Sequence, residues 1–452
     1  MEYLGVGIFF VLFFIVAWSR FRWAIGGFII GLPIFLAVSE HILKFKIGPI
    51  PTTLIEGVFG ILLLIWLVKF AKEDIKRIIA CLKKYRVGSI FGGVFLLASA
   101  ISIFTSGDFI PALGIWRAYF LEPALLFLIL IGRMERKGER FSKKDNQALS
   151  AQFLITSLII STISIAVYGI YQHIVGDDAF SQGLGLPVLR RVTSFFTSPN
   201  AVGLYVGPVL FLLSGLIIER LKSVTTPQKW KDLKIMIFLV VGLLSMIVLG
   251  LTKSEGAFVA LGAGAVVMLF FMGFRKIAVT LSVLAIIIGV GVPRIRQAIL
   301  FHDPSGRVRL SLWQNSWDYL VKSPTHFVFG AGLRQFHTKI QAPAQNNNFT
   351  KIEKQLYPHN VVLNFWVETG LFGMLSFFGL IGYAVRVSLK ILKKDNVWGA
   401  SLLAMIAVVV VHGLVDVPYF KNDLAMVWWF LMVIILYTHQ SVVSSPRLEP
   451  SS

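Results

Sequence analysis

Residues 235–251 read IMIFLVVGLLSMIVLGL, and residues 256–273, after a short polar break, read GAFVALGAGAVVMLFFMG. Neither stretch contains a charged residue, and an α-helix of roughly 20 apolar residues crosses the ~30 Å hydrocarbon core of a bilayer. Lipid offers the backbone no hydrogen-bond partners, so a span must be a helix or part of a closed barrel. The alternating pattern of barrel strands is absent. Both stretches are therefore expected to be transmembrane helices.

Similar apolar stretches recur along the whole chain. Together they predict an all-α polytopic membrane helix bundle of about 12–14 transmembrane helices, because short stretches can tilt or merge. The candidate spans are Tyr3–Ser19, Trp23–Ser39, Thr53–Val68, Val87–Gly107, Ile115–Gly132, Leu149–Tyr171, Ala201–Ile218, Ile235–Leu251, Gly256–Gly273, Ile277–Pro293, Leu371–Val385, Val397–Val415 and Leu424–Thr438.

The composition supports a membrane protein. Hydrophobic residues make up 56% of the 452 residues and charged residues only 15%, which excludes an ordinary soluble enzyme and a disordered chain. The net charge of +20 is attributed to loops beside anionic membrane lipid rather than to nucleic-acid binding. The only cysteine, Cys81, excludes an internal disulfide.

The positions of lysine and arginine predict the orientation. Most of the 43 basic residues fall in alternate connections, which places those connections in the cytoplasm. The N-terminus is then outside and the C-terminus inside. The predicted parts are spans 1–10 (1–293), a large extracytoplasmic loop (294–359), an interfacial helix with spans 11–13 (360–439) and a disordered cytoplasmic tail (440–452). Within the loop, Ser305–Ser323 has the period of a helix that Pro324 ends.

Arg117 and Glu122 lie inside a predicted span, where an ionisable group costs about 2.5–3.5 kcal/mol on insertion scales. Five residues apart on an α-helix, the two do not face each other squarely, so a local salt bridge is not the obvious arrangement. Arg117 is therefore a candidate phosphate ligand. The alternative is an arginine that snorkels to the membrane interface.

Two pairs of arginines lie in outward-facing segments. Residues 190–200 read RRVTSFFTSPN, and a double arginine outside opposes the charge rule. Guanidinium groups bind phosphate oxygens two at a time, so Arg190 and Arg191 are candidates to hold an anion. Arg307 and Arg309 are candidates for the same role, and Arg309 shares a helix face with Trp313. The alternatives are headgroup contacts for the first pair and a solvated helix face for the second.

His359 is the candidate general base. Histidine can accept a proton near neutral pH, and this one precedes an apolar segment on the predicted outer side. The alternative is a structural histidine. His412 and Asp416, four residues apart, form a second candidate pair. The sequence contains no HExxH, GxSxG or P-loop motif, so neither a metal nor a cofactor is expected.

His359-Asn360, followed by nine residues, Gly370, two residues and Gly373, resembles the histidine motif of the O-antigen ligase and O-antigen polymerase superfamily. Arg191 through Pro199-Asn200 resembles the arginine stretch of that family. Arg309 with Trp313, then Pro324 and Gly330-Ala331-Gly332, resembles the start of its large periplasmic loop. The resemblance covers roughly residues 190–385.

Two positions depart from the family pattern. Residues 252–256 read TKSEG where many members have Ser-Arg-Gly, so Glu255 replaces an arginine. We still expect the neighbouring Lys253 to contact substrate. Ser376 stands where ligases often have Gly, Thr or Tyr, which leaves ligase and polymerase both open.

The resemblance implies a GT-C-like glycosyltransferase of the bacterial cytoplasmic (inner) membrane, with its active site on the extracytoplasmic side. The donor would be a glycan on undecaprenyl diphosphate, and the acceptor a hydroxyl of lipid A–core, a glycan or a protein. His359 would take the acceptor proton, while Arg191 and Arg309 would stabilise the leaving diphosphate. The further substrate contacts would be Arg117, Arg190, Lys253, Arg307 and Asn360.

Two other kinds of function are open. An O-antigen or polysaccharide polymerase and a protein O-oligosaccharyltransferase belong to the same superfamily. A transporter or flippase of polyprenyl-linked sugars is an alternative of another class, and it predicts charges near mid-membrane and related halves. Charges inside the spans are sparse, and no internal repeat is found.

Overall fold

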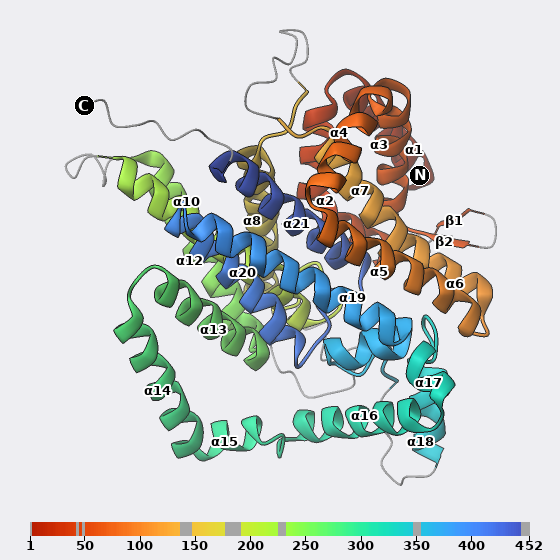
Figure 1. Cartoon of the computed structure of the whole chain (residues 1–452), viewed down its shortest axis with the longest axis vertical. Helices are drawn as coiled ribbons and strands as arrows, with labels where there is room; N and C mark the ends of the chain where they lie inside the picture. Colours follow the sequence, from red (N-terminus) through yellow and green to blue (C-terminus); the bar gives the residue numbers. More distant parts are fainter. Residues whose placement is uncertain are drawn as a thin grey trace.

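The computed structural model describes residues 2–41, 45–47, 50–135, 147–176, 191–224, 232–346 and 354–443. In these ranges the protein is a bundle of helices (Figure 1), joined by one small antiparallel hairpin of β1 (Phe45–Ile47) and β2 (Ile50–Thr52). The predicted all-α polytopic bundle is confirmed.

The helices of the first half are α1 (Glu2–Ser19), α2 (Phe21–His41), α3 (Leu54–Lys69), α4 (Ala71–Lys84), α5 (Arg86–Thr105), α6 (Phe109–Trp116), the π-helix η1 (Arg117–Leu121), α7 (Glu122–Gly132), α8 (Ala151–Val175) and α10 (Pro199–Ser223). The helices of the second half are α12 (Leu233–Thr252), α13 (Glu255–Phe271), α14 (Arg275–Gly291), α15 (Pro293–Ile299), α16 (Pro304–Val321), α17 (Pro324–Phe329), the π-helix η2 (Phe336–Gln341), α18 (Ala342–Asn346), α19 (Val361–Leu392), α20 (Asn396–Gly413) and α21 (Asn422–Val443).

Each of the thirteen predicted spans corresponds to a helical part of the described chain, but not all are full-length spans. Nine helices there are long and apolar enough to cross a membrane, or up to eleven if each of two bent pairs is one span. The bent pairs are α3 with α4, at 98°, and α14 with the helices that follow it, at 97°. The remaining two predicted spans are the shorter helices α1 and α13. The count therefore falls below 12–14, because an apolar stretch does not reveal a short or bent helix.

The centre of the bundle is formed by α10, α20 and α21. Of the apolar window of each helix, 78%, 78% and 72% is buried, against 22% for α5. Helices at the rim expose leucine, isoleucine and valine, as lipid-facing surfaces do. The last helix continues to Val443, so the predicted tail at 440–452 begins later than expected, and residues 444–452 lie outside the described residues.

An aromatic cluster joins α19 to the centre of the bundle. Phe365 of α19 stacks on Phe377 with ring centroids 4.0 Å apart. Tyr419, between α20 and α21, contacts Phe365 at 5.4 Å and Phe95 of α5 at 5.6 Å. These rings are buried, so the start of α19 packs against the centre of the bundle, and its place at the membrane interface stays a prediction.

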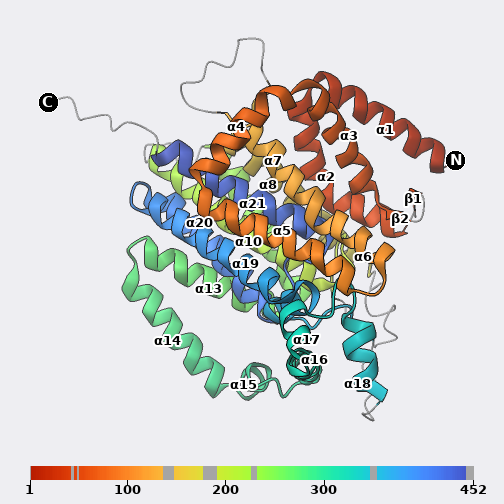
Figure 2. The ribbon, with the colours of Figure 1, turned by 45° about the vertical axis from the view of Figure 1, so that its right-hand side comes forward.

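The predicted large loop, 294–359, is largely helical. Figure 1 shows α14, α15 and α16 as an arm that leaves the bundle after α13 and returns to it at α17. The predicted helix Ser305–Ser323 corresponds to α16. Figure 2 shows α17 against the start of α19, where Ala331 N–H donates to Val367 O at 2.7 Å. Lys339 donates to Thr105 O at 2.8 Å, which anchors the returning segment to the end of α5.

Gly370 breaks α19 into two helical parts. Its φ is +74°, a left-handed value, and a Cβ there would lie 2.5 Å from Val328 O. Only glycine combines this conformation with such a close approach to α17. The break gives the first part of α19, Val361–Thr369, its own direction, and His359 lies just before it.

The helix ends fall into two groups, as the alternation of basic connections predicts. At one end Lys69 contacts Trp18 O, Arg133 pairs with Asp74, and Tyr85 hydrogen-bonds to His439. At the other end the starts of α10, α13 and α19 meet the turn after α20. The first group contains the basic segments predicted to face the cytoplasm. The assignment of either group to a side of the membrane stays a prediction.

Candidate active site

Backbone geometry and three hydrogen bonds position His359. Its φ is +51°, a left-handed value that costs a non-glycine residue about 1–3 kcal/mol and that functional sites often retain. Asn360 caps α19, since its Oδ1 accepts from the N–H groups of Val362 and Leu363. The Nδ2 of the same amide donates to Leu414 O at 3.0 Å. Asn360 therefore fixes the segment that carries the imidazole and ties it to the turn after α20.

A second anchor comes from α16. The indole Nε1 of Trp313 donates to the carbonyl of Pro358 at 2.9 Å, directly before His359. Arg309 lies one helical turn before Trp313, so the two share a helix face as the spacing predicts. The indole thus links the arginine-bearing helix to the histidine-bearing segment.

His359 is paired with Asp416. Its Nδ1 donates to Asp416 Oδ1 at 3.3 Å, and the Asp416 side chain is only 6% exposed. The other carboxylate oxygen accepts from Asn200 Nδ2 at 2.7 Å, and Asn200 Oδ1 in turn accepts from Ser254 Oγ at 2.8 Å. Four segments that are distant in the sequence therefore form one chain of hydrogen bonds that ends on the imidazole.

Asp416 is ionised at neutral pH. Burial raises the pKa of this carboxyl, but the charge of His359, its hydrogen bond, the charge of His412 and the hydrogen bond from Asn200 together lower it below the ordinary 3.8. A charged carboxylate on Nδ1 favours the tautomer that leaves Nε2 free of a proton, and it stabilises the imidazolium once Nε2 is protonated. The ring nitrogen of His359 that is left to accept a proton is therefore Nε2.

The side chains of His412 and Asp416, the second candidate pair, are not hydrogen-bonded to each other, because neither ring nitrogen of His412 has a hydrogen-bond partner among the described residues. Helix α20 ends at Gly413, but Asp416 N–H still donates to His412 O at 3.0 Å, so the two residues are neighbours. His412 is instead buried in the bundle between Gly203 and Gly256, at whose positions a Cβ would come within 3.2 Å of the ring. The sequence contained the signal for this arrangement, because a glycine shortly before a proline-containing turn commonly ends a helix.

Arg191 and Arg309 lie within electrostatic range of each other. Burial lowers the pKa of Arg191, the neighbouring Glu255 raises it, and Arg309 lowers it further. An arginine remains a cation at neutral pH despite such shifts. The Nε of Arg191 donates to Thr252 O at 2.9 Å, which holds it beside the start of α13. Two half-buried cations that repel each other form a place where a bound anion would be stabilised.

The other predicted contacts differ in position. Lys253 is exposed in the turn between α12 and α13, with a left-handed φ of +51°, next to the site. Arg307 is exposed on α16, and Glu255, which replaces the family arginine, acts on Arg191 as an acidic neighbour. Arg190 lies outside the described residues. The exposed Lys253, Glu255 and Arg307 give this end of the bundle a surface of mixed charge with more basic than acidic groups.

Arg117 belongs to a different cluster. It forms ion pairs with Glu56 at 2.9 Å and with Glu122 at 3.3 Å. The expectation that Arg117 and Glu122 do not face each other is wrong, because residues 117–121 form a π-helix, whose i to i+5 repeat places them on one face. The guanidinium already neutralises two carboxylates inside the bundle.

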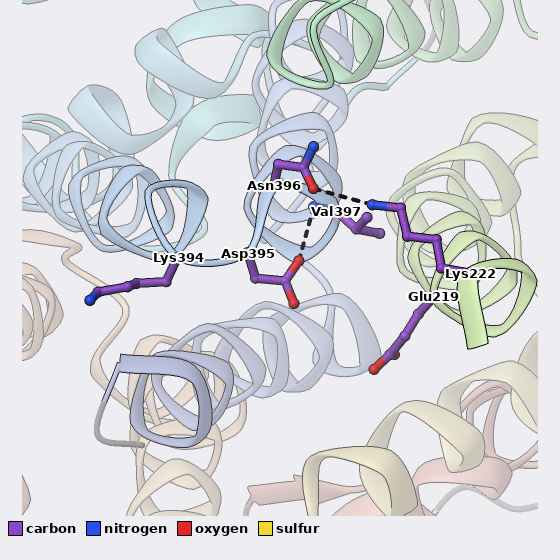
Figure 3. A pocket seen from close by; sticks show the side chains of 6 residues that line it. All are labelled: Glu219, Lys222, Lys394, Asp395, Asn396 and Val397. Atoms are coloured by element: carbon purple, nitrogen blue, oxygen red, sulfur yellow. Dashed lines mark hydrogen bonds between the residues drawn. The ribbon is translucent and has the colours of Figure 1, made fainter. Parts of the chain in front are cut away.

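The described residues contain no group of three or more His, Cys, Asp or Glu side chains placed to hold a metal ion. A hollow of about 270 Å³ lies between the end of α10 and the start of α20 (Figure 3). Its lining residues are Glu219, Lys222, Lys394, Asp395, Asn396 and Val397. The hollow is at the opposite end of α20 from Asp416, so it is separate from the cluster around His359.

Residues 238–378 match the family described as O-antigen ligase. The match supports membership of the O-antigen ligase superfamily. The matched segment runs from α12 into the second part of α19, beyond Gly370, and it includes Lys253, Arg309 and His359. Arg191, Asn200 and Asp416 lie outside it but contact the site. Comparison with curated proteins gives no match.

The match over residues 238–378 supports a likeness to O-antigen ligases, and the long apolar helices support a multi-pass membrane protein. Sequence reasoning located the imidazole and both arginines that the structure brings together. It missed the partners of His359, namely Asp416 and Gln355, and the bridging role of Asn200. Asn200 had a signal as the last residue of the arginine stretch, and Asp416 as the partner expected for His412, but neither signal pointed to His359.

Proposed function

We propose that the protein transfers a glycan from undecaprenyl diphosphate to an acceptor hydroxyl at the outer leaflet of the bacterial inner membrane. The single observation that carries the proposal is the pairing of His359 with the ionised, buried Asp416, in a cluster with two arginines. An oriented imidazole supplies a base, and the arginines supply positive charge where a diphosphate would leave.

The base acts through Nε2. The acceptor oxygen bonds to the anomeric carbon of the donor sugar, and its proton goes to Nε2 of His359. The resulting imidazolium is stabilised by Asp416 through the hydrogen bond at Nδ1. A positioned general base contributes about 10²–10⁴-fold in rate.

The arginines act on the leaving group. As the bond between the anomeric carbon and the diphosphate oxygen breaks, its electron pair goes to the diphosphate, and negative charge develops there. Arg191 and Arg309 stabilise this charge with forked donors, and they replace the divalent cation that many glycosyltransferases use, so we propose a metal-independent reaction. Attack opposite the diphosphate inverts the anomeric centre.

The remaining contacts follow from their positions. Lys253 and Arg307 are proposed to attract the anionic headgroup, because each belongs to a segment at this end of the bundle. Arg190, which lies outside the described residues, is proposed for the same role as the sequence neighbour of Arg191. Asn360 acts through the backbone that it caps. We propose no phosphate contact for Arg117, because its guanidinium is already paired with Glu56 and Glu122. The polyprenyl tail would lie between spans, in lipid.

The acceptor decides between an O-antigen ligase, our proposal, and a polymerase or protein O-oligosaccharyltransferase. All three share the same proton transfer and the same leaving group, so the cluster serves each equally. A flippase is a less suitable function, since a base paired with a carboxylate has no task in binding a headgroup for transport.

The test is a transfer assay with the purified full chain, undecaprenyl-diphosphate-linked glycan and candidate acceptors, without an ion gradient. The mass of the product identifies the new glycosidic bond. His359→Ala and Arg309→Ala should each lower transfer by about 10²-fold or more. His302→Ala and Lys322→Ala, which remove exposed groups of the same segment, should leave it unchanged. Full transfer by His359→Ala, or a requirement for a divalent metal, would contradict the proposal.

A further inference from the structure

The reactive nitrogen of His359 already has a partner. The Nε2 atom lies 3.0 Å from the side-chain amide of Gln355, while Nδ1 is engaged by Asp416. A glutamine amide can present its oxygen to a protonated ring or its NH2 group to a neutral one. In both cases Gln355 occupies the position from which a hydroxyl must approach Nε2.

The backbone of Gln355 is fixed while its side chain is half-buried. Its N–H donates to Gln341 Oε1 at 2.7 Å, and that buried oxygen also contacts His337 Nδ1 at 2.8 Å. The anchor holds the residue in place at η2. A rotation about the side-chain torsions of Gln355 is then sufficient to uncover the imidazole, without movement of the segment.

We propose that Gln355 caps the catalytic base in the resting enzyme and that the acceptor hydroxyl displaces it. Gln355 thereby marks the acceptor subsite. It is a positioning residue that restrains hydrolysis of the donor by water. This inference rests on the proposed function, in which His359 is the base.

The cap has a chemical purpose in this reaction. An uncovered Nε2 can activate water as well as a hydroxyl. The water oxygen would then bond to the anomeric carbon, its proton would go to Nε2, and the bond to the diphosphate would break with its electron pair on the diphosphate. The products would be free glycan and undecaprenyl diphosphate. While the amide holds Nε2, water has no base, and the donor is preserved until an acceptor competes for the same position.

The first measurement needs no substrate. Diethyl pyrocarbonate acylates neutral imidazole nitrogens, and mass spectrometry of peptides gives the labelling rate of each histidine in the full chain. In Gln355→Ala the rate at His359, divided by that at the exposed His302, should rise about fivefold, the factor that corresponds to one hydrogen bond of about 1 kcal/mol. Gln314→Ala, an exposed glutamine that contacts only Asp318 in the described hydrogen bonds, should leave the ratio unchanged.

The second measurement is release of undecaprenyl diphosphate from a short undecaprenyl-diphosphate-linked oligosaccharide, with water as the only acceptor. Gln355→Ala should raise this hydrolysis about fivefold, again the loss of one hydrogen bond, and Gln314→Ala should not. Gln355→Met keeps the length of the side chain but cannot hydrogen-bond through an amide. It replaces the alanine variant if that variant is poorly folded, and it should show the same rise in labelling and in hydrolysis.

The outcomes separate the two proposals. Unchanged labelling of His359 in both Gln355 variants would overturn the cap, whatever the enzyme transfers. Faster labelling without faster hydrolysis would overturn the claim that Gln355 keeps water from the base. Full transfer by His359→Ala would instead remove the proposed function, and the labelling result would still report on the contact between Gln355 and Nε2.

Discussion

Replacing Asp416 by asparagine removes one charge from the site, together with the oxygen that accepts from Asn200 Nδ2. The two side chains have the same shape, and the amide oxygen of the introduced asparagine can still accept from His359 Nδ1. The contact with Val417 N–H, at 2.8 Å, can also persist. The substitution therefore tests whether the carboxylate charge, rather than the hydrogen bond alone, supports the reaction.

The distance gives the magnitude. Two unit charges 3.3 Å apart attract each other by about 5 kcal/mol at an effective dielectric constant of about 20. The imidazole side chain is 24% exposed, and the asparagine keeps a dipole on the ring, so we expect the loss to be about 2–4 kcal/mol. A loss of that size slows the step in which the imidazolium forms by about 30- to 1,000-fold.

The assay is glycan transfer by purified Asp416→Asn in detergent or nanodiscs, with donor binding measured separately. The maximal rate should fall while donor affinity stays near the wild-type value, because Asp416 does not touch the diphosphate in this scheme. Asp318→Asn, the same replacement at an exposed position of α16, is the matched control. A maximal rate within about threefold of wild type, a cost below about 0.7 kcal/mol, would refute an electrostatic role for the carboxylate.

Three further outcomes are expected. Arg117→Ala should lower the free energy of unfolding by about 3–5 kcal/mol, because it leaves two buried carboxylates without their cation. A variant that melts at the normal temperature but cannot bind donor would contradict this structural role of Arg117. Gly370→Ala should destabilise the protein by about 1–3 kcal/mol and lower transfer, since its φ is +74° and its Cβ would meet Val328 O, whereas Gly382→Ala, where nothing lies within 4 Å, should be neutral in thermal unfolding. The lowered pKa of Asp416 keeps this carboxyl ionised at every pH above its ordinary pKa of 3.8. Between about pH 4 and 9, the dependence of the transfer rate on pH should therefore contain no ionisation that belongs to Asp416, and no ionisation should disappear in Asp416→Asn.

The spans were predictable from the sequence because burial in lipid demands long apolar stretches, and each of the thirteen stretches is helical. Their shapes were not. The 98° bend after Lys69 depends on the packing of α4 against α7, and the pairing of Arg133 with Asp74 that fixes this bend spans 59 positions of sequence. Hydrophobicity records that a segment is apolar and carries no information on which neighbour it meets.

The site was predictable where the residue type alone limits the chemistry. His359 stood out as a histidine that directly precedes an apolar segment. The arginines stood out because basic residues are disfavoured in segments predicted to face outward. The partners of these groups did not stand out. Asp416 was assigned to His412 on helical spacing, but its carboxylate pairs with His359, and Gln355 is one polar residue among several in its segment. A π-helix cannot be recognised by the periodicity of an α-helix, so the contact of Arg117 with Glu122 was missed.

The turn between α20 and α21 has a consequence for biosynthesis. His359 and Arg309 are translated well before Asp416, and the carboxylate enters the site only when the last pair of helices has been inserted into the bilayer. Under the proposed mechanism, a chain still held by the ribosome has arginines that attract lipid-linked sugar but no oriented base to act on it. Catalytic competence is thereby tied to insertion of α20 and α21, and a product terminated before Asp416 stays inert in the membrane.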